Sequence, residues 1–128
     1  MDNRVFLDTN YFIDAIHRKS EKNILEALIG YAAYVSPISV PIYCYLFKIE
    51  VPNDNLSIQI GKFRFVDLTR EILEKAVSGP TRDLEDNLQL HSAAEAECNY
   101  FLTNDEKLLK MKFFGKTKIA SKLGDNYS

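Results

Sequence analysis

Three aspartates stand at positions where their carboxylates could share one bound ion. Asp8 directly follows a short apolar run, Asp105 comes just after a second such run, and Asp86 falls in the first turn expected of a helix. Carboxylates without histidine or thiolate partners suit Mg²⁺ or Mn²⁺, and such an ion can activate water and neutralise charge that develops on a phosphoryl group. The set therefore predicts metal-assisted hydrolysis, although an aspartate after a strand can also serve simply as a helix cap.

These acids can meet only if the elements before them belong to one sheet. Apolar runs typical of buried strands occur at 4–8, 32–36, 63–68, 100–103 and 118–121. Helical patterns separate them, at 11–16, 21–29, 39–47, 70–77 and 83–97, while 51–59 is expected to be a loop or a short helix. The alternation predicts an α/β fold, in which right-handed βαβ units place helices on both faces of a mainly parallel sheet.

In such a sheet, ligands bind outside the carboxyl ends of the strands. If strands 4–8 and 100–103 are neighbours, Asp8 and Asp105 face each other, and Asp86 joins them from the start of an adjoining helix. Because converging carboxylates repel one another, a cation or bound protons must neutralise them. The expected fold therefore places the three acids where a divalent cation would stabilise the site.

The composition limits the class of protein. With 128 residues, of which 46% are hydrophobic and 27% charged, the chain fits a single domain spanning 1–128 that needs no disulfide or structural metal. Cys44 and Cys98 lack the spacing of metal ligands, so we expect reduced thiols. No apolar run approaches the ~20 residues of a membrane span, and the N-terminus lacks a secretory pattern, so we expect a cytoplasmic protein with no membrane partner.

Charge is unevenly distributed along the chain. The formal net charge of −2 predicts no global attraction for nucleic acid. The stretch 107–122, however, carries six lysines and no acid. A solvated face accounts for such a run, and a flank that holds a phosphate backbone beside the acids is the other interpretation.

Three segments, in order, resemble the motifs of PIN-domain ribonucleases. VFLDTNYFID at 5–14 is similar to the opening motif of that family, DLEDNLQ at 83–89 to its DxxDxxQ segment, and FLTND at 101–105 to its strand followed by TxD. Order, spacing and length are similar to those of VapC-type toxins of prokaryotic toxin-antitoxin pairs, and the resemblance covers nearly the whole chain. It implies a three-layer α/β/α PIN-like fold around a central, mainly parallel sheet.

The resemblance also implies a function, that of a metal-dependent endoribonuclease in which water attacks an RNA phosphodiester. Asp8, Asp86 and Asp105 would be the catalytic residues and would hold Mg²⁺ or Mn²⁺, directly or through water. The supporting residues would be Thr9, Asn10, Asp83, Thr103 and Asn104, with the threonine hydroxyls bonded to the carboxylates and Asp83 equally suited to capping a helix. The residues flanking the RNA would be Lys107, Lys110 and Lys112. Besides RNA, the implied partners are a cognate antitoxin and a second copy of the chain.

One position departs from the family pattern. PIN ribonucleases usually carry a glutamate early in the helix after the second strand, and here that place falls at Ile42. Glu50 is the nearest glutamate downstream, past the expected end of the helix. The missing acid favours an alternative function, a catalytically weak or silent PIN-like module that binds RNA or protein. A third interpretation, an aspartyl phosphotransferase, would need a second aspartate where Asn10 stands.

Overall fold

Helices and strands alternate along the chain, as the hydrophobic pattern predicts. The computed structural model describes residues 3–17 and 21–124. The strands are β1 (Arg4–Leu7), β2 (Ala32–Val35), β3 (Arg64–Phe65), β4 (Tyr100–Leu102), β5 (Phe113–Phe114) and β6 (Thr117–Ala120). The helices are α1 (Thr9–Ile16), α2 (Glu21–Ala27), α3 (Ser39–Phe47), α4 (Asp54–Ile60), α5 (Arg70–Val77), α6 (Leu84–Glu95) and α7 (Glu106–Leu109).

The strands form one sheet in the order β3-β2-β1-β4-β6-β5. All neighbouring pairs are parallel except β5 with β6. β1 and β4 lie side by side in the middle of the sheet, with Leu7 opposite Leu102. The two segments expected to carry the acids are therefore neighbours, and both end at the same edge.

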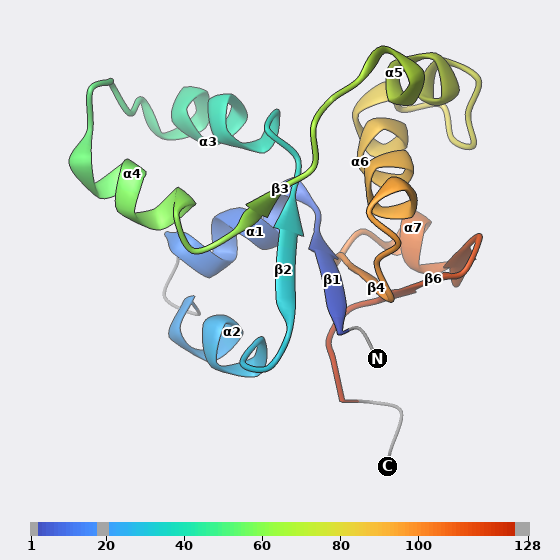
Figure 1. The fold of residues 1–128 in the computed structure, drawn as a ribbon, viewed down its shortest axis with the longest axis horizontal. Helices are drawn as coiled ribbons and strands as arrows, with labels where there is room; N and C mark the ends of the chain where they lie inside the picture. Colours follow the sequence, from blue (N-terminus) through green and yellow to red (C-terminus); the bar gives the residue numbers. More distant parts are fainter. Residues whose placement is uncertain (1–2, 18–20, 125–128) are drawn as a thin grey trace.

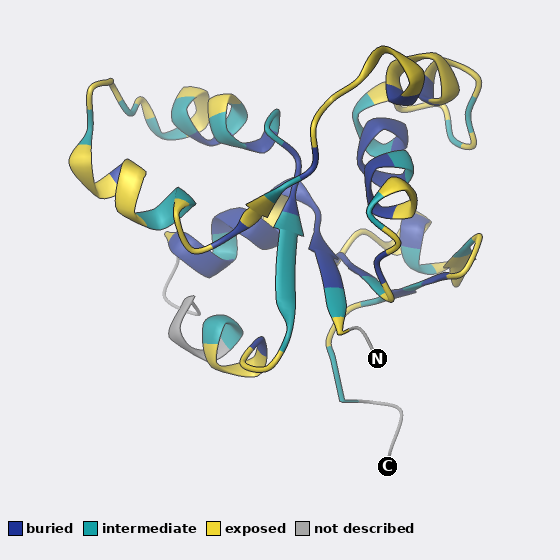
Figure 2. Cartoon of the chain, in the orientation of Figure 1, coloured by how far each residue is buried: buried dark blue, intermediate teal, exposed yellow. Residues whose placement is uncertain are grey.

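The sheet separates two hydrophobic cores. Successive side chains of β1 point to opposite faces, so Val5 and Leu7 belong to one core and Phe6 to the other, and all three are fully buried. Figure 1 shows α1 to α4 on one side of the sheet and α5 to α7 on the other. In Figure 2 the buried residues follow the central strands and the sheet-facing sides of the helices. This arrangement confirms the three-layer α/β/α architecture.

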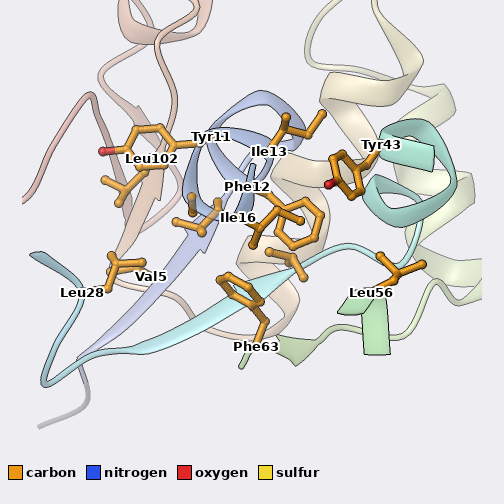
Figure 3. Close-up of a cluster of buried hydrophobic side chains, with 13 residues drawn as sticks. Val5, Tyr11, Phe12, Ile13, Ile16, Leu28, Tyr43, Leu56, Phe63 and Leu102 are labelled. Carbon is orange, nitrogen blue, oxygen red and sulfur yellow. The ribbon is translucent and has the colours of Figure 1, made fainter. Parts of the chain in front are cut away.

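The core beneath α1 fixes the direction in which that helix leaves β1. Phe12 is fully buried there, with its ring centroid 5.2 Å from that of Phe63 and 6.5 Å from that of Tyr43, both in edge-to-face geometry. Figure 3 shows these rings among aliphatic side chains from the sheet and from neighbouring helices. Each such aromatic pair stabilises the fold by about 0.5–1.5 kcal/mol beyond the effect of burying its apolar surface. The start of α1, where Asp8 stands, is therefore rigidly placed.

Some element boundaries differ from those predicted. The strand expected at 63–68 is only the two residues of β3, at the edge of the sheet. The segment 51–59 contains a short helix, α4, whose first turn is capped by Asn53 through a bond from the Leu56 amide (2.8 Å). α6 ends at Glu95 rather than 97, because Glu97 adopts a left-handed backbone (φ 55°). The short elements α7 and β5 were not predicted from the sequence.

Two further features concern the thiols and the length of the helices. Cys44 and Cys98 are both free, and burial raises the pKa of the Cys98 thiol to about 12, so this thiol stays protonated at neutral pH.

Across 3–17 and 21–124, none of the helices is both long and apolar enough to cross a membrane.

Candidate active site

The three predicted acids line one pocket at the carboxyl end of the sheet. The pocket has a volume of about 280 Å³. Its walls are formed by Asp8, Thr9, Asn10, Glu85, Asp86, Gln89, Asn104 and Asp105. The parallel pairing of β1 with β4 brings the first and last of these acids together, and α6 supplies Asp86. Among the described residues that line the pocket there is no lysine or arginine, so the negative charges have no built-in counter-ion.

Asp8 is the most buried of the three acids, with 8% of its surface exposed. Its Oδ1 accepts a hydrogen bond from the Tyr11 amide (2.8 Å), which caps α1, and its Oδ2 accepts one from the Thr103 hydroxyl. Burial raises the pKa of Asp8 to about 6 because desolvation disfavours the ionised form, and the charges of Asp105 and Glu85 act in the same direction. The two hydrogen bonds oppose this shift without cancelling it.

Asp86 stands in the first turn of α6. Its amide donates to Oδ1 of Asp83 (2.9 Å), the residue that caps this helix. The pKa of Asp86 is raised to about 6. Desolvation is the largest cause, and repulsion from the neighbouring acids adds to it, in the order Asp83, Asp105, Glu85 and Asp8. Asp83 therefore has the capping role that the sequence left open, while the Asp86 carboxylate itself lines the pocket.

Asp105 caps α7 and is exposed. Its Oδ1 accepts from the Lys107 amide (2.8 Å), and its own amide donates to the hydroxyl oxygen of Thr103 (3.0 Å). The Thr103 hydroxyl, fully buried, thus donates to Asp8 while it accepts from the backbone of Asp105. One side chain holds both acids at the strand ends, which is the contact predicted for Thr103.

We expect Thr103→Val to lower the free energy of unfolding by about 1–3 kcal/mol, because the buried Asp8 carboxylate and the Asp105 amide each lose a partner. Valine has nearly the same shape as threonine, so the packing of the site is kept. Urea unfolding at pH 7.5 measures the change. Thr103→Ser, which retains the hydroxyl, is the matched control and should lose less. Equal stability of the valine variant and the wild type would contradict this role.

Thr9 differs from its expected contact. Its hydroxyl bonds to Ser39 Oγ (2.8 Å) at the start of α3, not to a carboxylate. Both residues are buried, so this contact fastens α1 to α3 beneath the pocket. The sequence could not reveal it, because it depends on how two helices pack. Asn10 and Asn104 are exposed residues in the pocket wall.

A second cavity of about 460 Å³ adjoins the acidic pocket and shares Asp86 and Asp105 with it. Its remaining walls are Thr81, Arg82, Asp83, Lys107 and Leu108. Of the three lysines predicted to flank a nucleic acid, Lys107 borders this cavity. Lys110 and Lys112 are exposed beyond the end of α7 and line neither cavity.

The pocket contains a fourth acid that was not predicted from the sequence. Ile42 lies half-buried in α3 and Glu50 is exposed after that helix, and neither contributes to the walls of the acidic pocket. Glu85, immediately before Asp86, does contribute. A signal was available in the sequence, because Glu85 and Gln89 are four residues apart and share a face of the predicted helix.

The chemistry of the pocket fits a hydrated divalent cation. Across 3–17 and 21–124, no three His, Cys, Asp or Glu side chains are grouped so that they could hold a metal ion directly. Mg²⁺, however, usually keeps several waters and binds through one or two carboxylates. The donors here are all oxygen atoms, and their mutual repulsion would be relieved by a cation. Residues Asp8, Asp86 and Asp105 therefore fit such an ion, in part through its waters.

The fold and this pocket define a three-layer α/β protein with an acidic site at the strand ends. Comparison with protein families agrees, since the model of the PIN domain matches residues 5–114. The chain belongs to the PIN domain family. No curated protein matches the chain in sequence.

Solved structures with the same fold include bacterial toxin-antitoxin proteins. A chain in VapBC2 from Rickettsia felis, bound to a DNA fragment from the promoter, has 17% identity and a TM-score of 0.63, covering 91% of this chain and 97% of that one. VapC20 from Mycobacterium tuberculosis, a toxin that cleaves the sarcin-ricin loop, has 10% identity and a TM-score of 0.60, covering 89% and 98%. FitAB bound to the IR36 DNA fragment has 14% identity and a TM-score of 0.58, covering 96% and 99%.

Proposed function

We propose that this PIN-domain protein is a cytoplasmic, metal-dependent endoribonuclease that hydrolyses RNA phosphodiesters, and that it is the toxin of a type II toxin-antitoxin pair. The observation that carries the proposal is the meeting of Asp8, Asp86 and Asp105 in one pocket without a counter-ion. Structural neighbours with the same fold include a toxin that cleaves the sarcin-ricin loop. The family and the chemistry of the pocket thus support the same function.

In this proposal the three aspartates hold Mg²⁺ or Mn²⁺. When bound, the ion activates water and neutralises the charge that grows on the phosphoryl group. Thr103 fixes the Asp8 carboxylate and the backbone of Asp105, so that the acids need little reorganisation before the reaction. The amides of Asn10 and Asn104 can donate to the phosphate oxygens.

The cavity beside the acids would receive the RNA backbone. Arg82 and Lys107 stand in its walls, next to Asp86 and Asp105. Cations at this place can bind the phosphate that neighbours the reacting one, and they offset the repulsion between RNA and the acids. The basic stretch around Lys107 thus gains a specific role, while Lys110 and Lys112 would act at longer range.

We expect the double variant Arg82→Glu/Lys107→Glu to bind RNA more weakly and with a smaller dependence on salt. Removing one cation that binds a phosphate reduces the slope of log K against log salt by about 0.7 for a single strand. Fluorescence anisotropy with an Asp8→Asn background, designed to prevent cleavage, measures this slope. The pair Lys62→Glu/Arg64→Glu, at exposed positions near β3, makes the same change of charge and should keep the original slope. Equal slopes in the two double variants would refute the assignment.

The protein partners would be a cognate antitoxin and a second copy of the chain. In the DNA-bound VapBC2 and FitAB structures, one chain of each shares this fold. Large apolar side chains are exposed on α3, on α4 and between them, with Tyr45 84%, Val51 72% and Ile58 63% accessible. Exposed apolar side chains of this size are candidate contacts for such a partner.

Cleavage of a labelled mixed RNA pool tests the proposed activity directly. Purified protein is assayed with Mg²⁺, with Mn²⁺ and with EDTA, beside Asp8→Asn and Asp105→Asn. Metal-dependent cutting that both variants abolish is the expected result. The second candidate, a silent module that binds RNA or protein, is favoured by Ile42 at the family's glutamate position. Folded protein that neither cuts RNA nor binds metal, but binds RNA or protein without metal, would support that candidate instead.

A further inference from the structure

Glu85 and Gln89 form a linked pair in the wall of the acidic pocket. They lie one turn apart on the same face of α6, and Nε2 of Gln89 donates a hydrogen bond to Oε2 of Glu85 (3.2 Å). Both residues line the pocket together with Asp8, Asp86 and Asp105. The Glu85 carboxylate is therefore fixed on the side of α6 that faces the predicted acids.

Gln89 carries an unusual buried group. Gln89 is 1% exposed, and its Oε1 has no hydrogen-bond partner among the residues that the structure describes. Exchanging the two amide atoms would set an oxygen against the Glu85 carboxylate, so the donation from Nε2 is the chemically consistent arrangement. An unsatisfied buried acceptor is costly and is rare in folded proteins. This atom indicates that a water or another donor belongs in the pocket.

Glu85 is also electrically part of the site. Its charge is among the causes that raise the pKa of Asp8 and of Asp86. These carboxylates therefore repel one another across the pocket, and an ion that neutralises the aspartates would attract Glu85 as well. At Ile42, by contrast, α3 contributes an apolar side chain that forms no part of the pocket wall.

We propose that Glu85 is the fourth carboxylate of the cation site, supplied by α6 in place of the acid that is absent at Ile42, and that Gln89 is its positioning residue. This inference rests on the proposed function. The amide of Gln89 holds Glu85 toward the pocket through the bond from its Nε2. The site thus keeps four acids, with two of them adjacent on one helix.

The test is Mn²⁺ binding by the full chain, measured by electron paramagnetic resonance and by titration calorimetry without RNA. We expect Glu85→Gln to weaken binding about tenfold. Glu95→Gln, an exposed position on the same helix, is the matched control and should bind like the wild type. Circular dichroism and thermal melting verify that both variants fold. Equal affinities for Glu85→Gln and Glu95→Gln, with Asp8→Asn clearly weaker, would overturn the inference and leave the proposed function standing.

Asp8→Asn distinguishes failure of the proposed function from failure of the role of Glu85. If this variant binds Mn²⁺ as well as the wild type, the ion does not occupy the pocket, and both proposals fail. The double variant Ile42→Glu/Glu85→Gln tests whether the two positions are alternatives. Recovery of most of the lost affinity is expected, because the acid returns to the place usual in the family. A folded double variant whose affinity stays at the level of Glu85→Gln would contradict the exchange.

Discussion

Asp8→Asn should lower the rate of metal-dependent RNA cleavage by at least about 100-fold. Partners that only orient a metal ligand change affinity or activity by about 10–100-fold when they are removed, and Asp8 is proposed as a ligand itself. Its place is over-determined, since Tyr11 and Thr103 both donate to its carboxylate. Single-turnover cleavage of labelled RNA at saturating Mg²⁺ measures the loss.

The same substitution should make the metal-free protein more stable at pH 7.5. The pKa of Asp8 is raised from 3.8 to about 6, so keeping it ionised in the fold costs about 3 kcal/mol, at about 1.4 kcal/mol per pKa unit. Asparagine removes the buried charge while its amide oxygen still accepts from Tyr11. We expect the free energy of unfolding to rise by about 1–3 kcal/mol, as measured by urea titration in EDTA.

Asp67→Asn is the matched control for both measurements. Asp67 is exposed, and the same charge is removed there without touching the pocket. Its variant should keep the cleavage rate, and its stability should change by less than about 0.5 kcal/mol. Active Asp8→Asn protein would refute the catalytic assignment. If the Asp8→Asn protein is less stable than the wild type, the ionised Asp8 carboxylate stabilises the fold, which contradicts the expected cost of its burial.

The meeting of Asp8 with Asp105 could be predicted because it depends on local rules. Each acid follows a strand, parallel strands end at one edge, and the register that sets Leu7 opposite Leu102 then brings the two acids together. The capping role of Asp83 is equally local, since its side chain accepts a bond from an amide three residues on. Short-range geometry of this kind is readable from spacing alone.

The features that were missed depend on packing. The partner of Thr9 is Ser39, thirty residues away on another helix, and no spacing rule predicts that contact. Glu85 lies within the DLEDNLQ segment, at a position that the DxxDxxQ motif leaves unspecified. Its importance follows from the unpaired oxygen of Gln89, which only the fold can reveal. β5, which is joined to β6 by a turn at Gly115 (φ 61°), has only two residues and is too short for a hydrophobic pattern.

Acidification should have opposite effects on the stability of the metal-free protein and on its activity. In the folded chain the pKa of Asp8 and that of Asp86 are both about 6, against an ordinary value of 3.8 for an aspartate carboxyl group. Between these values the folded chain holds protons that the unfolded chain has released. The contribution of these two acids to the free energy of unfolding therefore rises as the pH falls from 7 toward 4, by at most about 1.4 kcal/mol per pH unit for Asp8. Below 3.8 both states are protonated and the gain is complete.

Cleavage should fall over the same range, because a cation competes with protons for these carboxylates. With Mg²⁺ below saturation and both acids required in their ionised form, the rate should drop by up to about 100-fold per pH unit below 6. Urea titrations in EDTA and single-turnover assays, both from pH 5 to 8, measure the two slopes. The Asp67→Asn variant should keep the wild-type dependence of both stability and cleavage rate on pH. In the Asp8→Asn variant the stability in EDTA should depend less on pH. The opposite result would be a cleavage rate independent of pH and a stability in EDTA that declines steadily below pH 6. It would mean that the ionised acids of this pocket stabilise the fold and do not serve to bind a cation.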